Sequence, residues 1–363
     1  MTGALPAVLA VDGGNSKSDL ALVADDGTLL ASARGPGITK PDLAMTLGLL
    51  TSLIGQAQRQ AGRPGCPVAR HLSACVANAD LPEEEQALAS ALRAQGWSST
   101  TEVVNDTFAV LRAGLDASVP AAPSVPADSS VPVASSVPAG PSAAAGGPAE
   151  RHWGVAVTCG AGINCVGVAP DGRKTGFLAL GGITGDWGGG HGLGQAALWW
   201  AMRAEDGRGP ETALRGAVAA HFGVPSVHDV AIGIHLGTIP EASLGGLAPA
   251  VLTLAGTGDD VAAGLVRRQA GEICAMALTV MRRLGLTGLA TPVVLGGSVL
   301  AARDPMLTAG VIEGIGAGAP HAAVRVTDVP PVAGAALLGL DHLGAGPEAE
   351  RRLRADYAER TPP

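Results

Sequence analysis

The 363-residue chain is poor in aromatic residues, in clustered positive charge and in long apolar runs. Tyr, Phe and Trp together make up 2% of the sequence, so the cores must be built from Ala, Val, Leu and Ile. The formal net charge is -8 and no Lys/Arg run is present, which argues against a role at nucleic acids or membrane surfaces, since both need concentrated positive charge. An anionic ligand would therefore need local hydrogen-bond donors.

Two further absences concern membranes and cysteine chemistry. No apolar run approaches the roughly 18 residues of a membrane span, and the N-terminus lacks the basic start and apolar core of a signal peptide. The five cysteines are odd in number and no pair has C-x-x-C spacing, which disfavours a disulfide framework, a zinc site and an iron–sulfur cluster. We therefore expect a cytoplasmic protein with buried thiols.

Glycine is abundant instead, and two Gly-rich bends have the same surroundings. The segment 9–27, LAVDGGNSKSDLALVADDG, runs from an apolar strand through a bend into a second apolar strand and an Asp-Gly turn. The segment 153–172, WGVAVTCGAGINCVGVAPDG, repeats this order, so that Gly27 recurs as Gly172. An internal repeat of about 145 residues predicts two related half-molecules.

The pattern of the first half predicts a mixed sheet. Three segments that alternate apolar and polar residues, 7–13, 18–25 and 28–34, are separated by Gly-containing turns and predict an antiparallel meander. Helical and strand patterns then alternate up to residue 115, which places helices on the faces of the sheet.

Residues 116–150 interrupt every pattern. They repeat Ser-Val-Pro and contain no aromatic residue, which predicts a disordered insert because recurrent Pro supports neither helix nor central strand. The expected parts are an N-terminal domain at 1–115 completed by a helix at about 332–343, the insert at 116–150, a C-terminal domain at 151–331, and a flexible tail at 344–363.

Each Gly-rich bend is either an ordinary hairpin turn or an anion site, because glycine lets successive backbone N–H groups face a ligand. The Walker pattern GxxxxGK[ST] is absent, and so is GxGxxG with a later acidic residue. Bends in duplicated halves suggest a nucleotide held from two sides. Asp12 could then hold Mg²⁺ through water, while residues 160–162 offer backbone donors.

Five motifs in a fixed order, DGGNSK, ND at 105–106, CGAGIN, GDWGGG and LGGS, resemble those of the BadF/BadG/BcrA/BcrD ATPase family, in particular its N-acetylglucosamine kinase branch. The resemblance covers nearly the whole chain except the insert and the tail. It implies an α/β fold of two duplicated actin-like (ribonuclease H-like) domains, each a mixed five-stranded sheet flanked by helices, with a cleft between them.

The same resemblance implies an ATP-dependent carbohydrate kinase that uses ATP and Mg²⁺. Such an enzyme transfers the γ-phosphate to the primary hydroxyl of an amino sugar, with N-acetylglucosamine expected to become its 6-phosphate. The implied partners are a small-molecule sugar and ATP, with no nucleic acid and no membrane, and a homodimer is left open.

The resemblance also assigns residues. Asp106 falls at the position of the general base, and Asp12 lies on the metal side. The expected ATP contacts are Gly13, Gly14, Asn15, Ser16, Lys17, Gly160, Ala161, Gly162, Gly296, Gly297 and Ser298. The expected sugar contacts are Thr39, Asn105, Asp106, Asn164, Gly185, Asp186 and Trp187.

Several positions depart from the family pattern and leave the sugar open among N-acetylglucosamine, glucosamine, N-acetylmuramic acid and glucose. GDEG reads GDWG at 185–188, GSN reads GIT at 37–39, and GTGSN reads GAGIN at 160–164. Trp187 could stack on a sugar face or only pack its loop. Asp106 could instead be a helix N-cap, and Asp186 a turn former.

Two other functions remain as alternatives. An ATPase that activates a partner enzyme would carry cysteines for an iron–sulfur cluster, and the spacing of the five cysteines does not suit one. A non-catalytic sugar sensor on the same fold would bring a DNA-binding helix-turn-helix, whereas the first strand pattern begins near residue 7.

Overall fold

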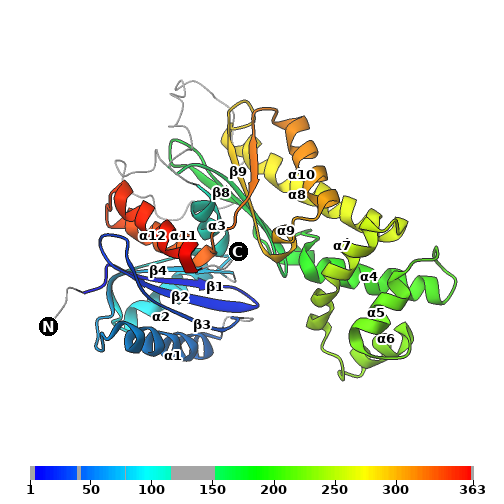
Figure 1. Cartoon of the computed structure of the whole chain (residues 1–363), viewed down its shortest axis with the longest axis horizontal. Coiled ribbons are helices and arrows are strands. Elements are labelled where there is room, and N and C mark those ends of the chain that lie inside the picture. The colour runs from blue at the N-terminus through cyan, green and yellow to red at the C-terminus, as the bar shows by residue number, and fades with distance from the viewer. Residues whose placement is uncertain (1–4, 39–41, 78, 116–151, 361–363) are drawn as a thin grey trace. The chain divides into compact units, whose positions relative to one another are not determined.

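The computed structural model describes residues 5–38, 42–77, 79–115 and 152–360 (Figure 1). The chain divides into two compact units. The first unit consists of Met1–Ala156, Val166–Leu178 and Thr327–Pro363, and the second of Val157–Cys165 and Ala179–Val326. The predicted insert at 116–150 and Thr39 lie outside the described residues.

The described residues form the following helices and strands, in chain order. Up to residue 115 they are β1 (Val8–Gly13), β2 (Lys17–Val23), β3 (Leu29–Pro36), α1 (Leu43–Ala61), β4 (Ala69–Val76), α2 (Pro82–Ala94), β5 (Ser98–Asn105) and α3 (Asp106–Gly114). From residue 152 they are β6 (Gly154–Cys159), β7 (Ile163–Val168), β8 (Lys174–Gly176), η2 (Gly181–Ile183), α4 (Gly189–Glu205), α5 (Leu214–Phe222), α6 (Val227–His235), η3 (Glu241–Leu247), α7 (Ala248–Gly256), α8 (Asp260–Leu284), β9 (Pro292–Gly296), α9 (Ser298–Ala301), α10 (Pro305–Gly318), β10 (Ala323–Val326), α11 (Pro331–His342) and α12 (Pro347–Arg360).

The first sheet has the strand order β3-β2-β1-β4-β5. Strands β1, β2 and β3 are antiparallel neighbours, whereas β4 runs parallel to β1 and β5 parallel to β4. The predicted meander followed by alternating elements therefore forms a mixed sheet. The parallel strands β1, β4 and β5 all end at one edge, which places the residues that follow them close together.

The second sheet repeats this order. Read from β8, its strands follow one another as β8-β7-β6-β9-β10, and β7 and β8 are antiparallel while β9 and β10 are parallel. The boundary between the two units passes through β6 and β7. Two mixed five-stranded sheets of the same topology confirm the duplicated α/β fold that the internal repeat predicted.

Alternating side chains of β1 pack into two different cores. Leu9 and Val11 join the core on the side of α1 and α2, whereas Val8 and Ala10 join the core on the side of α3 and α11. Helices α3 and α11 approach each other closely, because a Cβ atom at Gly334 of α11 would overlap the carbonyl oxygen of Ala109 in α3. This contact fixes the helix that begins with Asp106.

The C-terminal segment corrects the prediction of a flexible tail at 344–363. Residues Pro347–Arg360 form helix α12, whose Ala349, Leu353 and Tyr357 are buried against the first unit. The physical reason is their spacing of four residues, which puts all three side chains on one helix face even though the segment as a whole is highly polar. Helix α10 packs against α8.

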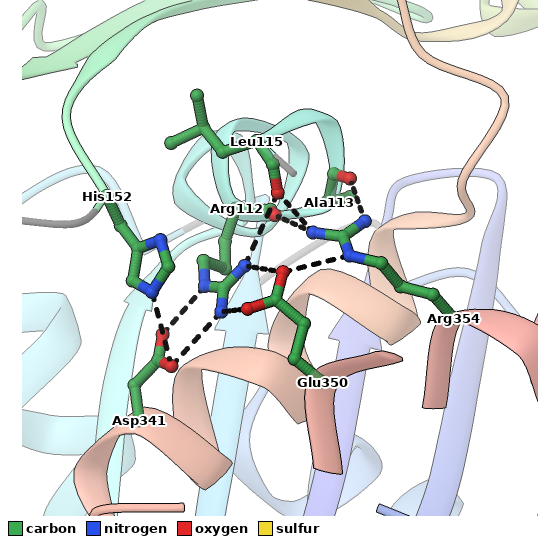
Figure 2. A network of polar contacts seen from close by, with 7 residues as sticks. All are labelled: Arg112, Ala113, Leu115, His152, Asp341, Glu350 and Arg354. Atoms are coloured by element: carbon green, nitrogen blue, oxygen red, sulfur yellow. Dashed lines mark hydrogen bonds and ion pairs between the residues drawn. The ribbon is translucent and has the colours of Figure 1, made fainter. Parts of the chain in front are cut away.

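A buried guanidinium joins α12 to α3 and α11, as Figure 2 shows. Arg112 of α3 is 2% exposed, and its Nε lies 2.7 Å from Asp341 Oδ2 and its Nη2 2.9 Å from Glu350 Oε2. Arg354 of α12 ion-pairs with Glu350 and donates a hydrogen bond to the carbonyl oxygen of Ala113. The end of α3 is therefore held by charged groups from both C-terminal helices.

The sequence predicts no membrane-spanning segment and buried thiols. Among the described residues, no single helix is long and apolar enough to cross a membrane; the bent pair α5 and α6 passes the same test together, at an angle of 53°. All five cysteines are free. Four of them are buried as expected, but Cys66 is exposed.

Candidate functional site

The carboxyl edge of the first sheet gathers the predicted acidic residues of the first unit. Gly13 of β1 pairs with Val76 of β4, which pairs with Asn105 of β5, so the three strands end in register. Asp12 is buried one residue before the end of β1, and Asp106 follows β5 directly as the first residue of α3. The fold thus brings together Asp12, Asn105 and Asp106 from two distant parts of the sequence.

Asn105, rather than Asp106, caps α3. Its side-chain oxygen accepts a hydrogen bond from the Thr107 N–H at 2.9 Å, which is the N-cap geometry. Asp106 in the first turn needs no role as a cap, and its negative charge lies at the favourable, positive end of the helix dipole. The geometry therefore does not support the interpretation of Asp106 as the N-cap of the helix.

The carboxyl groups of Asp12 and Asp106 at this edge have raised pKa values. Desolvation and the charges of Asp106 and Asp19 raise the pKa of Asp12 to about 8. Desolvation also raises the pKa of the half-buried Asp106 to about 6, against hydrogen bonds from Thr107 that lower it. Close carboxylates with perturbed pKa values are typical of functional sites.

Keeping these groups charged lowers the stability of the protein. The pKa of Asp12 and that of Asp106 are both raised from 3.8, so the folded state binds more protons than the unfolded state. Stability therefore falls as the pH rises from about 4, where the unfolded carboxyls lose their protons, through about 8, where the folded Asp12 loses its own. A fold that tolerates such a cost indicates that the charges serve a purpose other than stability.

Asp80 belongs to the same cluster but was missed by sequence reasoning. Its Oδ1 accepts a hydrogen bond from Asn105 Nδ2 at 2.7 Å, and desolvation and the charge of Asp106 raise its pKa to about 7. Asp80 lies four residues beyond the end of β4, at the same sheet edge as Asp106. An acidic residue just after a parallel strand was the signal that could have identified it.

The bend between β1 and β2 is a short hairpin connection. The Gly14 N–H donates to the carbonyl oxygen of Lys17 at 3.0 Å, and Asn15 and Ser16 are exposed at its tip. Lys17 Nζ lies 3.0 Å from Asp19 Oδ2, and Arg34 pairs with the same carboxylate. Of the predicted phosphate contacts, residues 15–17 therefore lie on the surface, with the Lys17 side chain held by Asp19, whereas Gly14 is partly buried and Gly13 is buried at the end of β1.

The corresponding bend of the second unit is hydrogen-bonded to the start of α4. The N–H groups of Gly190 and His191, at the start of α4, donate to the carbonyl oxygens of Gly160 at 2.7 Å and Ala161 at 2.9 Å. Because these carbonyls face α4, the outer side of the bend remains open: Ala161 and Gly162 are exposed, and a Cβ atom at Gly162 would meet nothing within 4 Å.

The strand-to-helix turn after β9 lies against this bend. Gly297 has φ 90° and ψ 157°, a conformation that only glycine adopts readily, and a Cβ atom there would lie 2.5 Å from the backbone of Cys159. A Cβ atom at Gly160 would lie 3.8 Å from the Ser298 nitrogen. The structure therefore joins two predicted ATP motifs, 160–162 and 296–298, that are far apart in the sequence.

The remaining predicted sugar contacts of the second unit are more scattered. Asn164 lies on β7 and accepts a hydrogen bond from the Cys165 N–H. Gly185, Asp186 and Trp187 form the loop before α4, in which Asp186 accepts a hydrogen bond from Thr184 Oγ1. The Arg268 guanidinium lies 3.9 Å from the centroid of the Trp187 ring, so Arg268 covers one face of this ring and helps to pack the loop.

One other group of ligand-type side chains occurs at the opposite end of β4. His71, Glu102 and His342 are the group of three among the described residues whose ligand atoms lie within 4.8 Å of one another. The two imidazole rings are stacked, with centroids 4.0 Å apart and an interplanar angle of 15°. Nitrogen lone pairs lie in the ring planes, so nearly parallel rings do not direct them at one ion, and we assign the group a packing role.

Comparison with known proteins places this geometry in a family. The sequence matches the model of the BadF/BadG/BcrA/BcrD ATPase family over residues 139–339, more than half of the chain. The chain belongs to the BadF/BadG/BcrA/BcrD ATPase family. The resemblance suspected from five short motifs is therefore confirmed, and the second sheet with both of its glycine motifs lies inside the matched region of this family.

Individual relatives of this family member are kinases. The chain is 23% identical over 297 residues to the N-acetylmuramic acid/N-acetylglucosamine kinase of Clostridium acetobutylicum, covering 81% of this chain and 85% of the relative. It shares its fold with a protein provisionally named N-acetylglucosamine kinase from Chromobacterium violaceum, with a TM-score of 0.66, 23% identity, and coverage of 93% and 99% of the two chains.

A second solved structure extends the fold to another group of sugar kinases. The ROK family glucokinase of Streptomyces griseus, in complex with glucose and AMPPNP, has a TM-score of 0.54 at 13% identity, and the match covers 93% of this chain and 98% of the glucokinase chain. The chain therefore shares the two-sheet fold of both solved structures.

Proposed function

We propose that the protein is an ATP-dependent kinase that phosphorylates the primary hydroxyl of an amino sugar, with N-acetylglucosamine as the main substrate. The sugar-kinase class is supported by the family and by the kinase relatives. The choice of an amino sugar is supported by the Clostridium relative, which acts on N-acetylmuramic acid and N-acetylglucosamine. The product would be the 6-phosphate of the sugar.

The observation that carries the proposal is the position of Asp106. It begins α3 at the carboxyl edge of the first sheet, its neighbour Asn105 supplies the helix cap, and its pKa is raised to about 6. A carboxylate with a pKa slightly below neutral is mostly unprotonated at neutral pH, yet basic enough to accept the proton of an attacking hydroxyl. In the proposed step, the sugar oxygen attacks the γ-phosphorus in line, its proton passes to Asp106, and ADP leaves.

The Gly-rich bends supply the proposed phosphate contacts. On the second unit, Ala161 and Gly162 are exposed, and the carbonyls of Gly160 and Ala161 are turned toward α4; the Gly160 N–H donates within the bend to the Gly162 carbonyl oxygen at 3.0 Å. The adjoining turn at Gly297 and Ser298 has no bulky side chain, which suits a base and ribose. On the first unit, the exposed tip formed by Asn15 and Ser16 is the second proposed contact.

Magnesium fits the acidic cluster. Asp12, Asp80 and Asp106 offer carboxylate oxygens, the ligands Mg²⁺ prefers, and a divalent cation would offset the burial and the repulsion that together raise the pKa values of Asp12 and Asp80. Mg²⁺ commonly keeps several of its waters, so Asp12 can hold it without the other carboxylates as direct ligands. When bound, Mg²⁺ would neutralise charge on the phosphates; the protein groups would position the sugar hydroxyl and accept its proton.

A coupled assay of ADP release tests the proposal. The protein with Mg-ATP would be offered N-acetylglucosamine, glucosamine, N-acetylmuramic acid and glucose in parallel. We expect ADP release that depends on the sugar, fastest with N-acetylglucosamine. ADP release that no sugar stimulates would refute the kinase function, and a preference for glucose would refute the amino-sugar assignment. Cytoplasmic location and a homodimer remain predictions from the sequence.

A further inference from the structure

An apolar pocket in the first unit takes no part in the proposed phosphoryl transfer. It has a volume of about 230 Å³ and lies between the start of α1 and the start of α2. Its walls include Ile38, Val76, Ala79 and Leu88, which are all buried, and Leu43, which is 39% exposed. The volume corresponds to several water molecules at about 30 Å³ each, so a small organic group would fit.

The pocket adjoins the residues proposed to hold the sugar. Val76 stands in register between Gly13 and Asn105 at the carboxyl edge of the sheet. Ala79 directly precedes Asp80, whose carboxylate holds the Asn105 side chain. A sugar that contacts Asn105 would therefore have the pocket beside it, on the α1 and α2 face of the same edge.

The charged groups that line this pocket are acidic, and Thr46 is the uncharged polar residue of its lining. Glu83 is exposed, and Glu84 is fixed because its Oε2 accepts hydrogen bonds from the N–H groups of Asp80 at 3.2 Å and Leu81 at 3.1 Å. An occupant that carried a carboxylate would meet like charges here, so the pocket suits an uncharged group.

We propose that this pocket binds the apolar end of an uncharged N-acyl group on the amino sugar, and that it accepts acyl chains longer than acetyl. The inference rests on the proposed kinase function. An acetyl group brings a single methyl, which leaves much of the pocket unfilled. Each added methylene that enters an apolar pocket improves binding by about fourfold, so short chain extension should favour the substrate until the pocket is full.

A chain-length series tests this inference on the unmodified protein. Values of kcat/KM would be measured with N-acetyl-, N-propanoyl-, N-butanoyl- and N-succinylglucosamine. We expect kcat/KM to rise about fourfold per methylene up to the butanoyl compound. The succinyl compound has a similar length but ends in a carboxylate, so its kcat/KM should be at least tenfold lower than that of the butanoyl compound.

A matched pair of variants on α2 adds an independent measurement. Ala87 lines the pocket and is exposed, so Ala87→Leu should fill the pocket without disturbing the core. It should lower the ratio of butanoyl to acetyl kcat/KM at least tenfold. Ala94→Leu, also exposed but at the far end of α2 and outside the pocket, should leave that ratio unchanged.

The outcomes separate the two proposals. Turnover of N-acetylglucosamine with no dependence on chain length, or a ratio that Ala87→Leu does not change, would overturn the pocket assignment and leave the kinase function standing. A succinyl substrate better than the butanoyl one would also overturn it. Failure of every sugar to stimulate ADP release would overturn the kinase function itself, and with it the pocket assignment.

Discussion

Two glycines of the second unit, both predicted to contact ATP, should differ in the property that is lost when each is replaced by alanine. A Cβ atom at Gly162 would meet nothing within 4 Å, and its φ is not in the left-handed region. Gly162→Ala should therefore leave the free energy of unfolding unchanged or raise it by up to about 1 kcal/mol. If the bend holds a phosphate, the methyl group would occupy the open side and weaken hydrogen bonds to a charged group.

Such bonds contribute about 1.5–3 kcal/mol each, which corresponds to a rise in the KM for ATP of about ten- to a hundredfold. Gly297→Ala should instead destabilise the protein. At φ 90° and ψ 157° the backbone strain is about 1–3 kcal/mol, and the Cβ atom would lie 2.5 Å from the Cys159 backbone. The total loss should reach about 2–5 kcal/mol.

The assay for this pair combines urea denaturation with the dependence of ADP release on ATP concentration. Gly162→Ala should keep its denaturation midpoint and lose affinity for ATP, whereas Gly297→Ala should lose stability as well. A Gly162→Ala protein with normal stability and an unchanged KM for ATP would refute the assignment of residues 160–162 to a phosphate. Normal stability of Gly297→Ala would refute the packing of the turn against β6.

Three further predictions follow from the first unit. Because Asp106 must be unprotonated to act as a base, log(kcat/KM) for the sugar should fall with a slope near one below about pH 6, and a flat profile from pH 5 to 8 would contradict its role. Asp80→Asn should lower kcat and shift this pH profile to lower pH, since it removes a negative charge near Asp106; an unchanged profile in a folded variant would limit Asp80 to a structural role. Arg112→Met should cost about 3–5 kcal/mol of stability in urea denaturation because Asp341 and Glu350 lose their buried partner, and a loss below about 1 kcal/mol would contradict this.

Periodicity and repetition predicted most of the fold. The meander at 7–34 and the repeat of its pattern at 153–172 depend on alternating apolar residues and glycine turns, which are local signals. They correspond to β1–β3 and to β6 and β7, and the strand order of the two sheets agrees. The helical nature of 347–360 was missed because only three of its residues are buried and apolar, among many charged ones, although their spacing places them on one face.

The candidate site could be predicted only in part. Asp12 and Asp106 are recognisable in the sequence because each is an acidic residue at the carboxyl end of a strand pattern. Asp80 was not, because its contact with Asn105 depends on the register of β4 against β5 and on the course of the loop after β4. The cation over Trp187 comes from α8, more than 80 residues later, and no local pattern indicates that contact.

The central claim is that Asp106 accepts the proton of a sugar hydroxyl, and the most direct test is sugar-dependent ADP release by the Asp106→Asn variant. Asparagine keeps the size of the side chain but cannot accept the proton, so kcat with N-acetylglucosamine should fall about 10²- to 10⁴-fold, with normal folding by circular dichroism. Full sugar-dependent ADP release by Asp106→Asn would contradict the account.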